Sequence, residues 1–402
     1  MNKQKQNPLK AHFSSRAIHT IISRNPFTLL LSPVILHLSS PSIFHPRAMI
    51  FVDGIPFTVE SSSSNKNCVS EQGADVLYAL MECPFLVDAT KSFKSIPEMR
   101  FTDSEQFGVE RSTICKWVYV FQKEYATVDP ALVDFVGTDE ATTCVGVAFR
   151  NRRNGMTSVA HIDFPNIIEN AVSQMLSLVV DPSSDAELDV HLVGGFEDVL
   201  LKESNDITEL EDRKKTEGYS FPLCNKIIER LWTRPETFHL QTLCVLHHNT
   251  RRDSKGNAYP IFSGFSVKTS DGSVFPASFD STSRCPDEVI RRIRLSSSYE
   301  DPSLKGRLLE TYETHTDQFK IEPCCWSPWK RYMALSLQQL SDAEILQSCS
   351  TSPSAEAPDF VENSRRQWAY LVEHPDWKES FPKKKPRIFR RAADGKWERS
   401  FN

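Results

Sequence analysis

The chain lacks the sequence features that mark several large classes of protein. No apolar run reaches the roughly 18 residues that a membrane-spanning helix needs, so we expect no membrane partner. None of the 10 cysteines forms a C-x-x-C pair, which argues against a structural zinc site. The net charge is -5, so we expect no nucleic-acid partner. Scattered thiols without a pairing pattern indicate a reduced, intracellular protein.

The N-terminal segment differs from the remainder in composition. Residues 1–48 carry lysine and arginine but no acid, and the first acid of the chain is Asp53. Such a composition is typical of an organelle-transit segment, but we favour a basic extension that is disordered or absent from the mature protein. Residues 49–402 then form a single domain, for which we expect a cytoplasmic location. The basic run Lys383–Lys385 leaves a nuclear address as an alternative.

The pattern of apolar residues predicts more strands than helices. We expect strands over residues 143–150 and 157–162, and a helix over residues 166–180, where apolar residues recur every three or four positions. Residues 281–320 are polar and show no clear pattern. Gly194-Gly195 is expected to make a tight turn after a strand. Few strand–helix–strand units are visible, which predicts an α+β fold with a mostly antiparallel β-sheet sandwich core and flanking helices.

A cysteine and a histidine lie at the two open ends of one predicted β-hairpin. Cys144 precedes the apolar run 145–149, and His161 ends the second strand, with the turn-forming segment 151–155 between them. A loop centre near residues 152–153 sets both side chains opposite each other on one face, whereas a one-residue slip would separate them. A thiol beside an imidazole can serve as nucleophile and base. The alternative is that Cys144 is a small buried hydrophobe.

The acids near this pair are candidates for a second role. Asp163 shares its strand parity with His161, so it is a candidate to orient the imidazole. Asp139, Glu140 and Asp163 are each candidates to accept a cationic group of a substrate. The alternative for each is an acid that caps a turn or faces solvent.

Several longer blocks make the chain resemble a known family of enzymes. The blocks are DEATTC (139–144), VHLVGGF (190–196), HLQTLCV (239–245), ASF (277–279), STSP (350–353) and FVE (360–362). Their order is similar to that of the protein N-terminal asparagine amidohydrolases, in particular the plant members. The resemblance implies hydrolysis of the side-chain amide of an N-terminal asparagine to aspartate and ammonia, with no metal or cofactor. It also implies protein or peptide substrates, whose new aspartate feeds arginylation and ubiquitin-dependent degradation.

The resemblance further implies catalytic roles for three residues. Cys144 falls on the nucleophile of the family, and His161 is the expected acid–base group. We expect a neighbouring imidazolium to lower the pKa of the thiol. A related group of bacterial glutamine deamidases has a threonine six residues before its cysteine, and Thr138 occupies that position here.

Two other functions remain open from the sequence. A papain-like cysteine protease also uses a cysteine and a histidine, but it places the histidine far downstream. A non-catalytic binder of N-terminal degradation signals needs an acidic pocket but no thiol. Sensitivity of the activity to iodoacetamide separates the thiol enzymes from the binder.

The boundary at Met49 gives a first testable prediction. A protein that begins at Met49 is expected to be as active and as stable as the full chain, because a basic, unpatterned segment buries little surface. Thermal melting and turnover of the two proteins, measured side by side, check this expectation. A clear loss of melting temperature in the shorter protein would show that residues 1–48 pack on the core.

Overall fold

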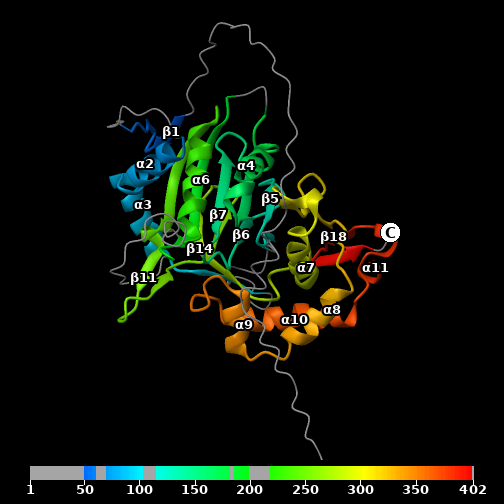
Figure 1. Cartoon of the computed structure of the whole chain (residues 1–402). Coiled ribbons are helices and arrows are strands. Elements are labelled where there is room, and N and C mark those ends of the chain that lie inside the picture. Colours follow the sequence, from blue (N-terminus) through cyan, green and yellow to red (C-terminus); the bar gives the residue numbers. More distant parts are fainter. Residues whose placement is uncertain (1–48, 60–68, 103–114, 182–184, 199–217, 401–402) are drawn as a thin grey trace, which may run out of the picture. The chain divides into compact units, whose positions relative to one another are not determined.

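The computed structural model describes residues 49–59, 69–102, 115–181, 185–198 and 218–400 (Figure 1). All of them belong to one unit of the chain, residues 46–402. The predicted extension 1–48 lies outside the described residues, so its boundary stays a prediction.

The largest sheet has eight strands and carries the predicted hairpin at its centre. The order of its strands is β15 (Leu309–Glu310), β5 (Glu124–Val128), β8 (Thr157–Ile162), β7 (Val145–Asn151), β9 (Glu187–Phe196), β10 (Thr237–Leu246), β1 (Met49–Val52) and β2 (Ile55–Pro56). The strands β5, β8, β7 and β9 are antiparallel neighbours, whereas β10 runs parallel to both β9 and β1.

Three smaller sheets complete the β-structure of the described residues. A five-stranded sheet has the order β3 (Met99–Phe101), β14 (Val274–Phe279), β13 (Phe265–Lys268), β6 (Phe135–Thr138) and β4 (Trp117–Tyr119). A four-stranded sheet contains β16 (Tyr312–Glu313), β17 (Gln318–Ile321), β18 (Arg387–Arg391) and β19 (Trp397–Ser400), and a hairpin pairs β11 (Thr250–Arg252) with β12 (Ala258–Pro260). The strands β18 and β19 pair antiparallel as a hairpin near the C-terminus.

The helices form two groups around these sheets. Those near the large sheet are α2 (Val69–Met81), α3 (Pro84–Ser95), α4 (Ile168–Leu176) and α6 (Ser220–Trp232). The later ones are α7 (Glu288–Ser298), α8 (Trp329–Leu337), α9 (Asp342–Cys349), α10 (Phe360–Glu373) and the short α11 (Trp377–Ser380). Helices α8, α9 and α10 lie together in the orange part of the chain (Figure 1).

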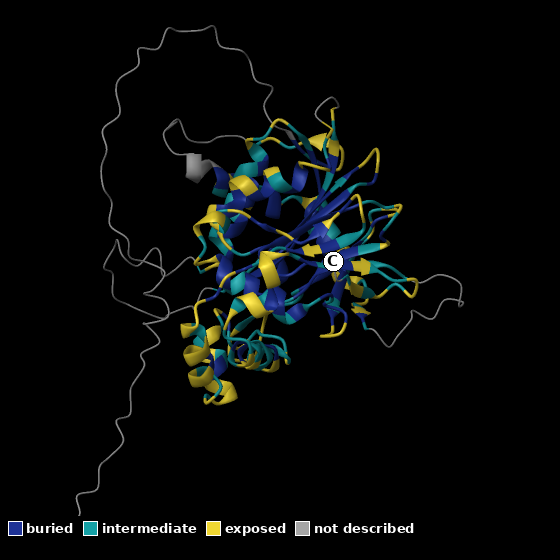
Figure 2. Cartoon of the chain, turned by 90° about the vertical axis from the view of Figure 1, so that its right-hand side faces the viewer, coloured by how far each residue is buried: buried dark blue, intermediate teal, exposed yellow. Residues whose placement is uncertain are grey.

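Alternation along the central strands places a core on each face of the large sheet. Val145, Val147 and Phe149 of β7 pack in one core with α2, α4 and α6. Ala148 of the same strand faces the other core, together with Phe265 of the second sheet. The result is a layer of helices on a sheet that packs on a second sheet, and Figure 2 shows the buried strands at its centre. The predicted α+β class is confirmed.

One local prediction was wrong, and one helix was not predicted. Gly194-Gly195 makes no turn, because β9 continues through both residues to Phe196 with a shift in its pairing to β10. Their φ angles of 113° and 56° are open to glycine at little cost, so the pair forms an irregularity inside a strand. The patternless segment 281–320 contains α7, whose inward face includes Arg291 as well as Ile290 and Ile293. Buried arginines hid the helical period of this segment.

None of the helices in the described part of the chain is both long enough and apolar enough to span a bilayer.

Candidate active site

The hairpin of β7 and β8 determines where the cysteine and the histidine lie. Gly146 pairs with His161, and Val145 pairs with Ile162. The ladder ends at this pair, so Cys144 and Asp163 lie just past the strand ends; extending the register by one step would set Cys144 opposite Asp163 rather than opposite His161. The register is thus displaced by two residues from the predicted one, and an even displacement keeps side chains on the same face. On that extension Cys144 and His161 would be diagonal neighbours, for which a regular ladder gives about 7 to 8 Å between Cα atoms.

The imidazole of His161 is held from the second sheet. Its Nδ1 lies 2.9 Å from Oγ1 of Thr138, at the end of β6. The Thr138 hydroxyl donates to the carbonyl oxygen of Asp139 at 3.4 Å, so it can accept a hydrogen bond from Nδ1–H. Nε2 of His161 is buried and has no hydrogen-bond partner among the described residues. With the proton on Nδ1, Nε2 carries the lone pair of the neutral imidazole.

Burial keeps both members of the pair uncharged. Burial lowers the pKa of His161 to about 4, although the charge on Glu140 opposes the shift. Burial also raises the pKa of the Cys144 thiol well above its ordinary value, and the charges on Asp163 and Glu356 raise it further. The expected lowering of the thiol pKa by an imidazolium is therefore absent from the resting site. At neutral pH the pair consists of a thiol and a neutral imidazole.

Asp139 is engaged on both of its carboxylate oxygens. Oδ1 accepts from the Tyr119 hydroxyl at 2.7 Å, and Oδ2 accepts from the Phe279 amide at 2.8 Å. Arg284 donates to both oxygens, from Nε at 3.2 Å and Nη2 at 3.1 Å. The structure places this carboxylate inside a hydrogen-bond network of the protein, with no oxygen left over for a substrate.

Glu140 is held in the same network. It accepts two hydrogen bonds from Arg292, at 2.9 and 3.1 Å, and lies 3.0 Å from Nη1 of Arg284. Burial acts to raise its pKa, but Arg292 and Arg284 outweigh burial and hold the pKa below its ordinary value. The backbone of Glu140 is left-handed, with φ of 61°. The two arginines thus stabilise a strained turn just before Cys144.

Asp163 differs from these two acids because one of its oxygens is free. Oδ2 accepts from the hydroxyl of Tyr299 and from Nε2 of Gln122, the latter at 3.3 Å. Oδ1 is buried and has no hydrogen-bond partner among the described residues. Burial raises the pKa of this carboxyl against the effects of Tyr299, Gln122 and Lys123. An acceptor of this kind, beside Cys144, suits a cationic ligand group.

A second carboxylate near the thiol was missed by sequence reasoning. Glu356 acts on the pKa of Cys144, and its own pKa is raised to about 7, chiefly by burial. Its side chain accepts from Ser350 in the loop that follows α9. The block STSP pointed to this loop, but no periodicity or spacing in the sequence linked Glu356 to residues two hundred positions earlier.

The same C-terminal loop contacts the segment that carries the cysteine. Ser352 donates to Oγ1 of Thr142 at 3.0 Å, and Thr351 lies 3.1 Å from Oγ1 of Thr143. These contacts hold the loop that carries Glu356 against the segment just before Cys144, although the two segments are far apart in the sequence. Among the described residues, no group of three His, Cys, Asp or Glu side chains is placed to hold a metal ion.

Comparison with known proteins assigns the chain to a family. The sequence matches the family described as protein N-terminal asparagine amidohydrolase over residues 107–399. A protein N-terminal asparagine amidohydrolase of Arabidopsis thaliana is 53% identical over 87% of this chain and its own full length. The proteins of that name from Mus musculus and Homo sapiens are 32% and 30% identical, each over 70% of this chain and 83% of their own. The chain belongs to the protein N-terminal asparagine amidohydrolase family. It is therefore an enzyme, an amidohydrolase.

The amidohydrolase fold requires glycine beside the cysteine. A Cβ on Gly194 would lie 2.7 Å from the carbonyl oxygen of Cys144 and 3.1 Å from that of Ala141. Strand β9 can therefore approach the cysteine segment this closely only without a side chain at that position.

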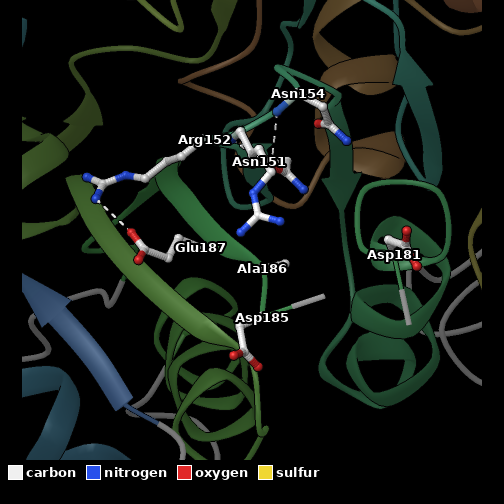
Figure 3. A pocket seen from close by; sticks show the side chains of 8 residues that line it. Asn151, Arg152, Asn154, Asp181, Asp185, Ala186 and Glu187 are labelled. Carbon is white, nitrogen blue, oxygen red and sulfur yellow. Dashed lines mark hydrogen bonds and ion pairs between the residues drawn. The ribbon is translucent and has the colours of Figure 1, made fainter. Parts of the chain in front are cut away.

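A cavity of about 340 Å³ lies at the turn end of the β7–β8 hairpin, away from Cys144. It is lined by the turn between β7 and β8 and by residues near the start of β9, where Glu187 faces Arg152 (Figure 3). The cavity is polar and lies at the opposite end of β7 from Cys144, so we do not place the reaction there. His191 on β9 pairs with Ala148, four residues along the chain from Cys144, and its Nδ1 lies 3.0 Å from Oγ1 of Thr242, while His239 on β10 pairs with Asp189.

The buried ion pairs of the amidohydrolase give a prediction about stability. Arg284→Gln is expected to lower the free energy of unfolding by about 3 to 5 kcal/mol, because it leaves Asp139 buried without its cation. The matched control is Arg252→Gln, which breaks the exposed pair with Glu197 and should cost less than about 1 kcal/mol. Urea unfolding measures both values. Equal small losses would show that Arg284 does not stabilise the turn.

Proposed function

We propose that the chain is a cysteine-dependent amidohydrolase that converts the N-terminal asparagine of proteins and peptides to aspartate and releases ammonia. One observation carries this proposal. Nε2 of His161 and Oδ1 of Asp163 are both buried without a partner among the described residues, at the end of the β7–β8 hairpin that Cys144 precedes, and the charge on Asp163 acts on the Cys144 thiol. Asparagine at a free N-terminus offers one amide and one ammonium group, which match a base-assisted thiol and an unpaired carboxylate. The names of the relatives agree with this substrate.

The proposed reaction proceeds in two steps through a thioester. Nε2 of His161 takes the proton of the Cys144 thiol while the sulfur bonds to the carboxamide carbon. Backbone N–H groups around Cys144 are the proposed donors to the oxyanion, a contribution of a few kcal/mol. Collapse of this adduct breaks the C–N bond, and His161 returns the proton to the departing ammonia. Water, deprotonated by the same nitrogen, then cleaves the thioester to aspartate and the free thiol.

Thr138 is proposed to fix the tautomer on which both steps depend. A hydroxyl that accepts from Nδ1–H keeps the proton on Nδ1 and the lone pair on Nε2. Because burial lowers the pKa of His161 to about 4, the imidazole is neutral and ready to accept a proton at physiological pH.

The α-ammonium of the substrate has a second proposed role beyond anchoring. Charges on Asp163 and Glu356 raise the pKa of the resting thiol. An ammonium group bound at Asp163 offsets those charges and makes deprotonation of Cys144 easier. Asp139 and Glu140 are the less suitable acceptors, because Arg284 and Arg292 already occupy their oxygens.

We further propose the cellular setting that the resemblance implies. The new N-terminal aspartate is proposed to be arginylated and then recognised for ubiquitin-dependent degradation, with the enzyme in the cytoplasm and the nucleus as an alternative. The substrates are proteins and peptides that expose asparagine at a free N-terminus.

Ammonia release from three matched peptides tests the reaction. The enzyme is expected to act on the Asn peptide, to act roughly 10²-fold more slowly on the Gln peptide, whose amide carbon lies about 1.5 Å further out, and not to act on acetyl-Asn. Cys144→Ala should abolish turnover, whereas the control Cys349→Ala, at an exposed cysteine, should retain it. Turnover by a folded Cys144→Ala protein would exclude the proposed nucleophile. Peptide-bond cleavage, or binding without ammonia release, would favour a protease or a binder.

Opposite effects on two rates test the role of Asp163. Asp163→Asn is expected to reduce kcat/KM for the Asn peptide by about 30-fold or more, the equivalent of about 2 kcal/mol for a lost buried charge contact. The same change removes a charge that raises the pKa of Cys144, so alkylation of Cys144 by iodoacetamide should become faster. Asp271→Asn, in an exposed turn, is the control for both rates. Unchanged kcat/KM in Asp163→Asn would assign the ammonium to another acid.

A further inference from the structure

Two exposed aromatic rings border the proposed ammonium site. Phe164 follows Asp163 in the chain and is 45% exposed, and Tyr299 at the end of α7 is 42% exposed. Their ring centroids lie 6.0 Å apart with the planes at 77°. The Tyr299 hydroxyl donates to the carboxylate of Asp163. The rings therefore lie next to Asp163 and present apolar surface to solvent.

The protein holds both rings in place. Nζ of Lys123 lies 4.5 Å from the centroid of the Tyr299 ring, and Nε2 of Gln122 donates to the Tyr299 hydroxyl at 3.4 Å. Phe164 has an extended backbone, with φ of -139° and ψ of 141°, and Pro165 follows it. A proline restricts the residue before it to such extended conformations, so the position of Phe164 is fixed locally. Rings held in this way bind a ligand at a small cost in conformational entropy.

The geometry of the substrate brings its second residue to these rings. In asparagine the ammonium, the side chain and the carbonyl carbon all branch from one α-carbon. If the ammonium binds Asp163 and the amide reaches Cys144, the carbonyl is the only branch left to leave the site. The next α-carbon lies about 3.8 Å from the first, which keeps the second side chain within reach of the neighbours of Asp163.

We infer that Phe164 and Tyr299 form a subsite for the side chain of the second substrate residue, and that the enzyme prefers a large apolar or aromatic residue there. This inference rests on the proposed function, because it uses the position of the ammonium at Asp163. The occupant is part of the substrate itself, continuous with the asparagine that the site already holds. Contact with an aromatic pair corresponds to a gain of about 2- to 12-fold in kcat/KM.

A peptide series with a single variable position tests the subsite. Peptides Asn-Xaa-Gly-Gly, with Gly, Ala, Leu, Phe or Asp at Xaa, are expected to show kcat/KM about 2- to 12-fold higher for Phe and Leu than for Gly. Phe164→Ala should bring the Phe and Leu peptides to the level of the Gly peptide, chiefly through KM, and leave the Gly peptide unchanged. The matched control is Tyr78→Ala, another exposed aromatic residue, which is 54% exposed on α2. It should retain the full preference.

A second variant separates the ring of Tyr299 from its hydroxyl. Tyr299→Phe keeps the aromatic surface but removes the bond to Asp163. It is expected to lower turnover of all five peptides by the same factor and to leave their ratios intact. A change in the ratios would show that the Tyr299 hydroxyl, and not its ring, determines the preference for the second residue, and would overturn the proposed subsite.

The outcomes distinguish failure of the subsite from failure of the reaction. Ammonia release from every peptide at equal kcat/KM would overturn the subsite and leave the proposed deamidation intact. An equal loss on all peptides in Phe164→Ala would also overturn it, since that result indicates a structural role. No ammonia from any peptide, including Asn-Gly-Gly-Gly, would overturn the proposed function and the subsite together.

Discussion

The buried charge cluster of Asp139, Glu140, Arg284 and Arg292 is the interaction on which the site depends. Asp139 and Glu140 follow the end of β6 in the segment that leads to Cys144, and Glu140 has a left-handed backbone. Burial of two such charges would be prohibitive without cations, and both cations come from one distant stretch, just before and within α7. The cluster therefore ties the second sheet, the turn before Cys144 and α7 into one unit. Thr138 begins this turn and contacts His161, so the position of the imidazole depends on the same ion pairs.

The cluster also divides the acids around the thiol into two kinds. Asp139 and Glu140 are neutralised by arginine and serve the structure, whereas Asp163 has an unbonded oxygen and Glu356 has a pKa raised to about 7 by burial. Both of the latter act on Cys144, and neither has an arginine of its own among the ion pairs described. Two carboxyl groups thus lie next to the proposed nucleophile, which must itself become negative in the proposed reaction. In that proposal the arrangement is unfavourable until a cation enters, and a free N-terminus supplies one.

Sequence reasoning could predict the face of the sheet but not the contacts across the domain. The observed register of β7 and β8 differs from the expected one by two residues, an even number, so the parity argument for Cys144 and His161 survives the shift and their placement on one face stays a prediction. The sequence shows a glycine at position 194 but not why it is needed. The close approach of Gly194 to the Cys144 carbonyl depends on β9 lying beside β7, which no local sequence pattern encodes. Glu356 was missed because it acts on a residue far away in the sequence. Helix α7 was missed because buried arginines break the apolar period that marks a helix.

The uncharged state of the resting pair has a consequence for selectivity. Proteins expose many internal asparagines, and a permanent thiolate beside an imidazolium would be reactive towards them and towards oxidants. Here burial lowers the pKa of His161 and raises that of Cys144, so the pair is dormant at neutral pH. An internal asparagine brings an amide but no ammonium, and it leaves Oδ1 of Asp163 buried without a partner. In the proposed function, the same missing charge weakens binding and leaves the proposed nucleophile protonated. On that proposal, discrimination against internal asparagine acts on both binding and thiol deprotonation through one carboxylate.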